Sequence, residues 1–188
     1  MYVSTQLRTP AAVKFFRKVQ KAEEILNCIG ILACPDLFST GMASIDKLKR
    51  GKDLHKWHNN VKIWPSFSSG IEVIANRHTP SHRDGQGGPA CYDFLISAGR
   101  HSNGWLDLPD IDAQLSYDPC TVVAFCGKIL CHGVNPKWTG GRLCIAHFIR
   151  DNVHDWQELE QPPWVLHDQY LSFMDNGFCC RQDVAVDN

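Results

Sequence analysis

Two segments in the first third of the chain carry apolar residues at helical spacing. Residues 11–27 (AAVKFFRKVQKAEEILN) place apolar side chains on one face, while Lys and Glu cover the other positions, which is the pattern of an amphipathic helix. The apolar stripe consists of Val13, Phe16, Val19, Ile25 and Leu26. Asp36 to Leu48 predicts a second helix, interrupted near Ser39–Gly41.

From Trp64 the pattern changes to short apolar runs separated by Gly, Pro, Asn and Asp. Such runs predict β-strands joined by turns, and many short strands favour a sandwich or barrel. The predicted strands are Ile71–Ala75, Tyr92–Ser97, Gly104–Leu108, Thr121–Phe125, Lys128–Cys131 and Leu143–Ile149. The sequence therefore predicts an α+β, mainly β fold in which two N-terminal helices pack against an antiparallel sandwich.

A length of 188 residues fits a single domain with its own hydrophobic core. We divide it into a helical support (1–62), a β core (63–156) and a C-terminal tail (157–188), which we expect to be irregular with a short helix. The longest apolar run, Ile25 to Cys34, is too short to span a bilayer, and the N-terminus carries no secretion signal pattern. We expect an intracellular protein that does not insert into a membrane.

Cysteine usage and charge distribution refine this expectation. The nine cysteines are odd in number and include no Cys-x-x-Cys pair, so free thiols in a reducing compartment are favoured over a disulfide framework. Residues 1–62 carry eleven Lys/Arg against five Asp/Glu, whereas residues 63–188 carry eight against fifteen. The basic part could contact a phosphate backbone or could be a solvated helix face, and the sequence leaves both open.

Candidate metal ligands occur at three positions. His82 and Asp84 are separated by one residue, and on an extended strand such residues point to the same face, so Arg83 points away. His132 follows a predicted strand and supplies a second imidazole. Two histidines and one carboxylate can bind one face of Fe(II) and leave the other positions open. The alternative for each histidine alone is a core or surface role, and the complete set favours the metal.

Arg142 precedes an apolar stretch, which predicts that its guanidinium is buried. A buried charge needs an anionic partner, and the distal carboxylate of a 2-oxo acid could pair with this cationic fork. A structural salt bridge with an aspartate such as Asp118 is the alternative. With the three metal ligands, Arg142 predicts an Fe(II)- and 2-oxoglutarate-dependent oxygenase. A zinc hydrolase would give no reason for this arginine.

The chain resembles the TET/JBP oxygenases in four stretches, WPSFSSGIEVIANRHTPSHRD, CYDFLISAG, LPDIDAQLSYDPCTVVAFCGKILCHGV and GGRLCIAHFIRDNVHDW. More narrowly, it resembles the short single-domain forms of mushroom-forming fungi, from about Ala33 to Trp156. The resemblance implies a double-stranded β-helix (jelly-roll) core with preceding helices. It also implies that Fe(II), O2 and 2-oxoglutarate are used to oxidise the methyl group of 5-methylcytosine or thymine in DNA.

The resemblance assigns site residues position by position. The positions that match metal ligands are His82, Asp84 and His132. Arg142 matches the arginine that binds 2-oxoglutarate, and Arg77 matches a position that also contacts this cosubstrate in some relatives. Asn76 beside Arg77, and Cys144 two residues after Arg142, complete the expected cosubstrate site.

Three positions depart from the family pattern. Cys144 replaces a serine and is a weaker hydrogen-bonding group than a hydroxyl, so cosubstrate affinity is expected to be lower. Cys120 replaces a turn glycine that would permit a positive φ. Gly87 replaces an Asn or Asp that contacts the base in relatives, which leaves recognition of methylcytosine open.

A base within duplex DNA would have to be flipped out to reach the metal. The residues expected near the substrate are Tyr92, Asp93, His147 and Arg150. We expect a monomer that acts on DNA, oxidises 5-methylcytosine to 5-hydroxymethylcytosine and further, and works in the nucleus. Two alternatives remain: a 2-oxoglutarate-dependent hydroxylase of a non-nucleic-acid substrate, and an inactive metal-binding member of the family that acts in interactions.

Overall fold

A computed structural model describes residues 9–51, 61–85 and 87–162. Within them lie helices α1 (Pro10–Ala33), α2 (Pro35–Arg50) and α4 (Asp151–Gln157), the 3-10 helix η3 (Pro109–Ile111), and eight strands. The strands are β1 (Gly70–Ala75), β2 (Thr79–His82), β3 (Asp93–Ser102), β4 (Trp105–Leu108), β5 (Ala113–Ser116), β6 (Val122–Phe125), β7 (His132–Val134) and β8 (Thr139–Phe148).

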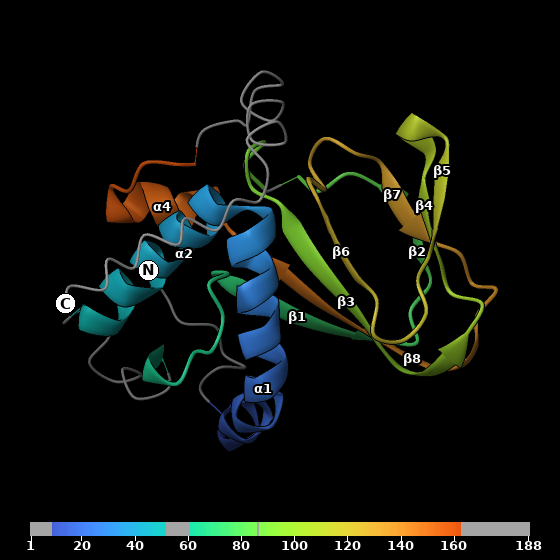
Figure 1. The fold of residues 1–188 in the computed structure, drawn as a ribbon, viewed down its shortest axis with the longest axis horizontal. Helices are drawn as coiled ribbons and strands as arrows, with labels where there is room; N and C mark the ends of the chain where they lie inside the picture. The colour runs from blue at the N-terminus through green and yellow to red at the C-terminus, as the bar shows by residue number, and fades with distance from the viewer. Residues whose placement is uncertain (1–8, 52–60, 86, 163–188) are drawn as a thin grey trace, which may run out of the picture.

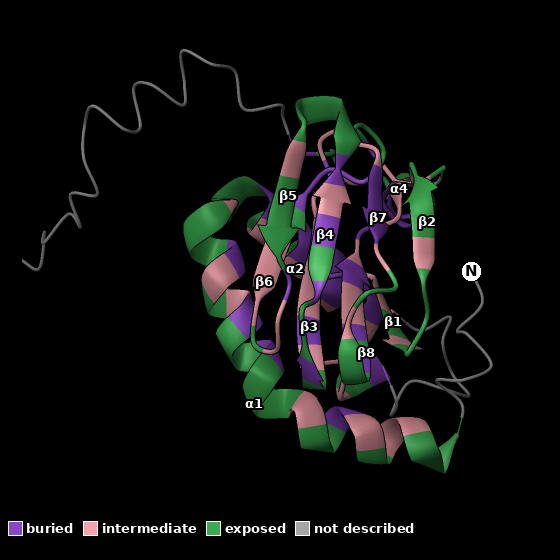
Figure 2. Ribbon diagram, turned by 90° about the vertical axis from the view of Figure 1, so that its right-hand side faces the viewer, coloured by how far each residue is buried: buried purple, intermediate pink, exposed green. Residues whose placement is uncertain are grey.

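The strands form two four-stranded sheets, with the orders β1-β8-β3-β6 and β2-β7-β4-β5. All the strand pairs are antiparallel. The helices gather beside the first sheet, and the second sheet lies on its other side (Figure 1). In the second sheet β7 is buried along its length, whereas β2 and β5 at the edges are largely exposed (Figure 2). The predicted antiparallel sandwich with N-terminal helices is confirmed.

Two apolar clusters hold these layers together. One joins the helices to the first sheet through Leu26, Leu37, Phe67 and Phe94. The other lies between strands of the two sheets, and its buried members are Leu106, Leu108, Tyr117, Phe125, Val134 and Cys144. The second cluster borders the interior in which the candidate site lies, so the same packing positions both.

Helix α1 is longer than the predicted segment 11–27. Pro10 stands at its first turn, and Thr9 caps it by accepting a hydrogen bond from the Ala12 N–H at 3.3 Å. Pro35 begins α2 directly after Cys34. One member of the predicted apolar stripe, Ile25, is 64% exposed, so the assignment of this residue to the buried face was wrong.

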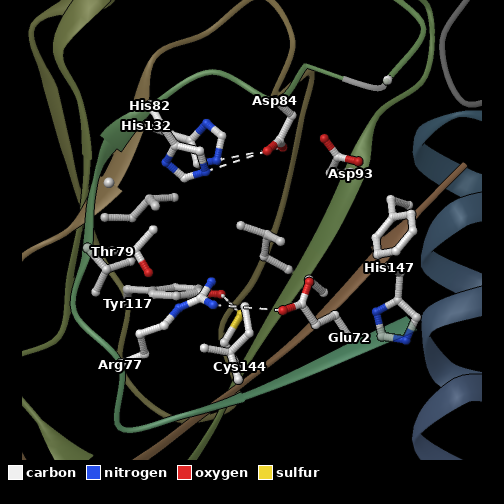
Figure 3. A pocket seen from close by; sticks show the side chains of 18 of the residues that line it. Glu72, Arg77, Thr79, His82, Asp84, Asp93, Tyr117, His132, Cys144 and His147 are labelled. Carbon is white, nitrogen blue, oxygen red and sulfur yellow. Dashed lines mark hydrogen bonds and ion pairs between the residues drawn. The ribbon is translucent and has the colours of Figure 1, made fainter. Parts of the chain in front are cut away.

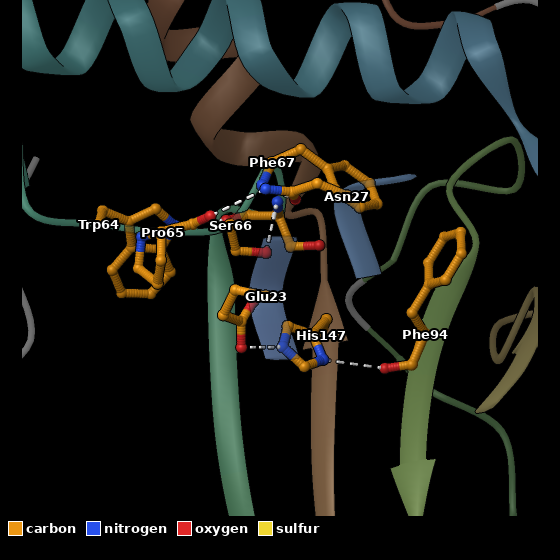
Figure 4. A network of polar contacts seen from close by, with 9 residues as sticks. Glu23, Asn27, Trp64, Pro65, Ser66, Phe67, Phe94 and His147 are labelled. Carbon is orange, nitrogen blue, oxygen red and sulfur yellow. Dashed lines mark hydrogen bonds and ion pairs between the residues drawn. The ribbon is translucent and has the colours of Figure 1, made fainter. Parts of the chain in front are cut away.

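The buried face of α1 is instead partly polar (Figure 4). Glu23 lies in it and bonds the imidazole Nε2 of His147 on β8 at 2.9 Å, with both side chains buried. The His147 Nδ1 donates to the Phe94 carbonyl at 3.2 Å. Asn27, one turn after Glu23, donates to the Pro65 carbonyl at 3.0 Å. These bonds fix α1 against the first sheet and the segment that leads into it.

Helix α2 runs without the interruption predicted near Ser39–Gly41. Gly41 allows the helix to pack closely, because a Cβ at this position would lie 2.5 Å from the Phe67 carbonyl oxygen. Glycine thus permits close approach of the chain segment before β1 rather than breaking the helix. The predicted interruption of the helix was wrong, because Gly41 permits a close tertiary contact with Phe67 and does not break the helix.

The predicted strand Lys128–Cys131 is also wrong. It is a turn, in which the Ile129 and Leu130 N–H groups donate to the Cys126 carbonyl at 3.1 and 3.0 Å. The strand that follows, β7, begins at His132. Strand β5 and helix α4 were not predicted. Strand β2 was anticipated as the extended segment carrying His82 and Asp84, but it ends at His82, so Asp84 lies just beyond it.

Helix α4 packs against α2 and is tied to it by polar contacts. The Gln157 amide donates to the Ser44 carbonyl at 3.1 Å, and the Lys47 ammonium donates to the Gln157 carbonyl. Residues 158–162 follow without regular structure, and the rest of the predicted tail lies outside the described residues. None of the helices in the described part of the chain has the length and apolar character that a membrane crossing requires.

The seven cysteines in the described ranges are free, as predicted. Cys91, Cys126 and Cys144 are buried, whereas Cys28 and Cys120 are exposed. Cys179 and Cys180 lie outside the described residues.

Candidate active site

A pocket of about 290 Å³ lies among the strands, and both sheets contribute to it. One end holds the predicted metal ligands, and the other holds Tyr117, Cys144 and Arg77 (Figure 3). Arg142 also lines the pocket. The structure therefore brings the residues predicted for the metal and for the cosubstrate into one cavity, except Asn76, which does not line it.

The three predicted metal ligands converge. The Nε2 atom of His82 lies 3.5 Å from one Asp84 oxygen, and the Nε2 atom of His132 lies 3.8 Å from the other. One ligand atom from each residue can be chosen so that all three lie within 4.8 Å of one another. His82 and His132 are direct partners in the β2–β7 ladder, so the pairing of the two strands sets their separation.

Hydrogen bonds fix which nitrogen of each imidazole faces the site. The Nδ1 of His82 lies 2.9 Å from the Pro80 carbonyl, and the Nδ1 of His132 lies 3.1 Å from the Leu130 carbonyl. A carbonyl only accepts, so each Nδ1 carries the proton and each Nε2 has a free lone pair. Burial also lowers the pKa of His132 and favours its neutral form. This donor set fits a divalent metal ion.

Gly127, which sequence reasoning missed, backs the carboxylate of the site. Its carbonyl accepts from the Asp84 N–H at 2.9 Å, and its N–H donates to Asp93 Oδ2 at 3.1 Å. A Cβ at position 127 would contact both carboxylates. Burial, with a further contribution from the Asp84 charge, raises the pKa of Asp93 to about 7, although the Gly127 N–H opposes this shift.

Arg83 points away from the site, as predicted. Its guanidinium donates to both oxygens of Asp110, at 2.8 and 2.9 Å, and to the Ile129 carbonyl at 2.9 Å. The bond to Ile129 links the segment between His82 and Asp84 to the turn before His132, and the bonds to Asp110 link it to η3. The intervening residue thus has a structural role.

Arg142 is only 2% exposed. Its guanidinium carbon lies 5.2 Å from the ring centroid of Tyr117 and 5.4 Å from that of Trp138. Its Nε and Nη1 atoms have no hydrogen-bond partner among the described residues, and no carboxylate there lies within ion-pair distance. Asp118 instead accepts from the Gly104 N–H and the Ser116 hydroxyl. The salt bridge considered as an alternative is therefore not formed, and the free donors fit a carboxylate ligand.

The other residues expected at the cosubstrate have different surroundings. Arg77 lines the pocket and lies 3.9 Å from Glu72. Asn76 has a φ of 49° and holds the backbone of Arg142, accepting from its N–H at 2.8 Å and donating to its carbonyl at 2.9 Å. Cys144 is buried, with its sulfur 3.4 Å from the Tyr117 hydroxyl. Asn76 is thus placed to position Arg142 through its backbone.

The four residues expected near the substrate have three kinds of surroundings. Asp93 and Arg150 line the pocket. His147 borders it, but both imidazole nitrogens are engaged by Glu23 and Phe94, so neither is left for a substrate. Tyr92 packs against the apolar cluster between the helices and the first sheet. No signal local to His147 reveals its partner, which is 124 positions away.

The remaining departures from the family pattern are also visible. Cys120 has a φ of 71°, in the left-handed region that the glycine of the family pattern would adopt without strain. Gly87 lines the pocket, and a Cβ there would meet no atom within 4 Å. Gly87 therefore contributes open space to the pocket in place of the Asn or Asp side chain of the family pattern.

Comparison with known proteins agrees with this geometry. The family model Tet_JBP, described as the oxygenase domain of the 2OGFeDO superfamily, matches residues 4–151. The match begins upstream of Ala33, the first residue of the sequence resemblance, and includes α1. No curated protein matches the chain.

Among solved structures, the chain is similar to NgTET1 in complex with 5mC DNA. The TM-score is 0.58 and the sequence identity 17%, over 81% of this chain and 56% of that one. At this identity the similarity shows a shared fold, which is consistent with the expected jelly-roll core, and the chain spans little more than half of its relative. Because the family model covers most of the chain, this protein belongs to the Tet_JBP family of oxygenase domains in the 2OGFeDO superfamily.

Proposed function

We propose that this protein is an Fe(II)- and 2-oxoglutarate-dependent dioxygenase that oxidises the methyl group of 5-methylcytosine in DNA. The observation that carries the proposal is the presence of a 2-His-1-carboxylate set and a buried arginine with free donors in one pocket. Family membership supports the enzyme class. The similar NgTET1 structure holds 5mC DNA, which supports the substrate.

His82, Asp84 and His132 would hold Fe(II) on one side. With 2-oxoglutarate and O2, the bound iron supplies the oxidising chemistry that replaces a methyl hydrogen by a hydroxyl group. The protein orients the reactants: Arg142 and Arg77 bind the distal carboxylate of 2-oxoglutarate, and the sheets exclude water.

Substrate recognition would use the pocket residues on the metal side. Asp93, whose carboxylate lies beside that of Asp84 at Gly127, and Arg150 are polar residues of the pocket lining. The expected metal ligands line the same pocket, and the methyl group of a stacked base could not reach them. The target nucleotide would therefore leave the stack before reaction. A single domain, a monomeric state and a nuclear location are the corresponding proposals for the whole protein.

The test is to load the protein with Fe(II) and 2-oxoglutarate without oxygen, and then to add air and a 5-methylcytosine duplex. Mass spectrometry of the digested nucleosides should find hydroxymethyl-, formyl- or carboxylcytosine. Asp84→Ala should abolish the products, whereas the exposed Asp155→Ala should retain them. Succinate without an oxidised base would keep the enzyme class and point to a non-nucleic-acid substrate. Metal binding without succinate would indicate an inactive member of the family.

A further inference from the structure

Tyr117 is a buried phenol at the end of the pocket opposite the metal ligands (Figure 3). It follows β5 and is fully buried. Its N–H donates to the Gly104 carbonyl at 2.8 Å, and its carbonyl accepts from the Ser97 hydroxyl at 2.8 Å and from His101 Nε2 at 3.1 Å. These three bonds fix the backbone, and the apolar cluster of which Tyr117 is a buried member packs around the ring, so its hydroxyl has a defined position in the pocket.

The proton of the Tyr117 hydroxyl has a weak acceptor nearby. It lies 3.4 Å from Cys144 Sγ, and a thiol is a poor donor and acceptor. Burial, with contributions from Cys144, raises the pKa of this phenol, although the charge of Arg142 and a hydrogen bond from its side chain oppose the shift. The hydroxyl therefore keeps its proton at neutral pH and is available to donate to a stronger acceptor.

The surroundings of Arg142 indicate that the stronger acceptor would be an anion bound beside the Tyr117 hydroxyl. Its guanidinium lies against the Tyr117 ring, is almost fully buried, and has two nitrogens without a partner among the described residues. An uncompensated charge is costly in such a place. A carboxylate bound there would accept from the guanidinium and from the phenol together, which would satisfy both groups.

We propose that Tyr117 is a 2-oxoglutarate-binding residue whose hydroxyl donates to the distal carboxylate beside Arg142. The inference rests on the cosubstrate of the proposed function and is independent of its DNA substrate. Because Tyr117 would contact only the distal carboxylate, it would favour 2-oxoglutarate over 2-oxo acids that lack this group. Cys144 would be a bystander whose replacement by serine places a second hydroxyl at the same point.

The test measures binding of 2-oxoglutarate and of 2-oxobutyrate to the Mn(II)-loaded protein by calorimetry, without DNA. Tyr117→Phe should weaken 2-oxoglutarate binding about 10-fold, the effect expected for a lost hydrogen bond to a charged group, and should leave 2-oxobutyrate binding unchanged. Mn(II) affinity should stay within about twofold, because the metal ligands lie at the other end of the pocket. Ser116→Ala, which removes a neighbouring hydroxyl outside the pocket lining, should change none of these values.

Two serine variants complete the design. Cys144→Ser should tighten 2-oxoglutarate binding several-fold, and Tyr117→Phe with Cys144→Ser should recover most of the lost affinity. The proposal is overturned if Tyr117→Phe binds 2-oxoglutarate as the wild type does, or weakens both oxo acids equally. If Tyr117→Phe does not fold, Tyr117→Met, which also removes the hydroxyl but keeps a flexible apolar side chain, takes its place, and wild-type affinity for 2-oxoglutarate in that variant then overturns the proposal. A wild type that binds 2-oxoglutarate but oxidises no base would refute only the proposed DNA substrate.

Discussion

The imidazoles of His82 and His132 face each other across the β2–β7 ladder, with ring centroids 4.3 Å apart. Each donates its Nδ1 proton to the carbonyl two residues before it. The register of two short strands therefore sets the separation of the two expected ligands, and a carbonyl two residues upstream sets the tautomer of each. A slip of one residue would turn one imidazole to the opposite face, so the candidate metal site depends on this pairing.

Substitution of Gly127 should damage the metal site without removing a ligand. A methyl group at this position would contact the Asp84 and Asp93 carboxylates, so the Asp84 side chain would have to move. We expect Gly127→Ala to weaken Co(II) or Mn(II) binding by about 10-fold or more, the usual scale for groups that orient ligands. Gly141→Ala, at a glycine with open space around it, is the matched control. Equal metal affinities in the two variants would contradict the role assigned to Gly127.

The contact between Glu23 and His147 should contribute strongly to stability. Glu23→Ala would leave a buried imidazole nitrogen without its partner, and we expect the free energy of unfolding to fall by about 3 kcal/mol. Glu24→Ala, at the next and exposed position, should change it by no more than about 0.5 kcal/mol. Urea unfolding followed by circular dichroism would measure both. Similar losses in the two variants would mean that the buried contact adds little.

Sequence patterns predicted those parts of the candidate site that depend on residues close together in the chain. His82 and Asp84 could be placed on one face because a strand alternates with period two. The run Lys128–Cys131 has the composition of a strand, but it lies in a turn that brings His132 to its ladder partner. The buried Glu23 could not be foreseen, since its partner His147 is distant in sequence.

Cys120 occupies a conformation that glycine adopts without strain. Its φ of 71° and its exposed side chain mean that only the backbone is affected by substitution. We expect Cys120→Gly to be about 1 kcal/mol more stable than Cys120→Ala, which keeps a Cβ in the left-handed region. Thermal unfolding of the two variants under reducing conditions would measure the difference. If alanine proved equally stable, the turn would have to be free of strain.

His154 should make the fold sensitive to mild acid. It is fully buried in α4, and neither ring nitrogen has a hydrogen-bond partner among the described residues. Burial lowers its pKa, although the charges of Asp151 and Asp155 oppose the shift. The unfolded chain, with an ordinary pKa of about 6.5, therefore binds a proton more readily than the folded protein does.

Stability from this group is present above about pH 6.5 and is lost as the pH falls from there towards the lowered folded pKa. Urea midpoints of the wild type should decline between pH 7.5 and 5.5, and His154→Phe should decline less. His78→Asn, which changes an exposed histidine in the loop between β1 and β2, should follow the wild type. A decline of the same size in His154→Phe would assign the acid sensitivity to other groups, such as the buried His132.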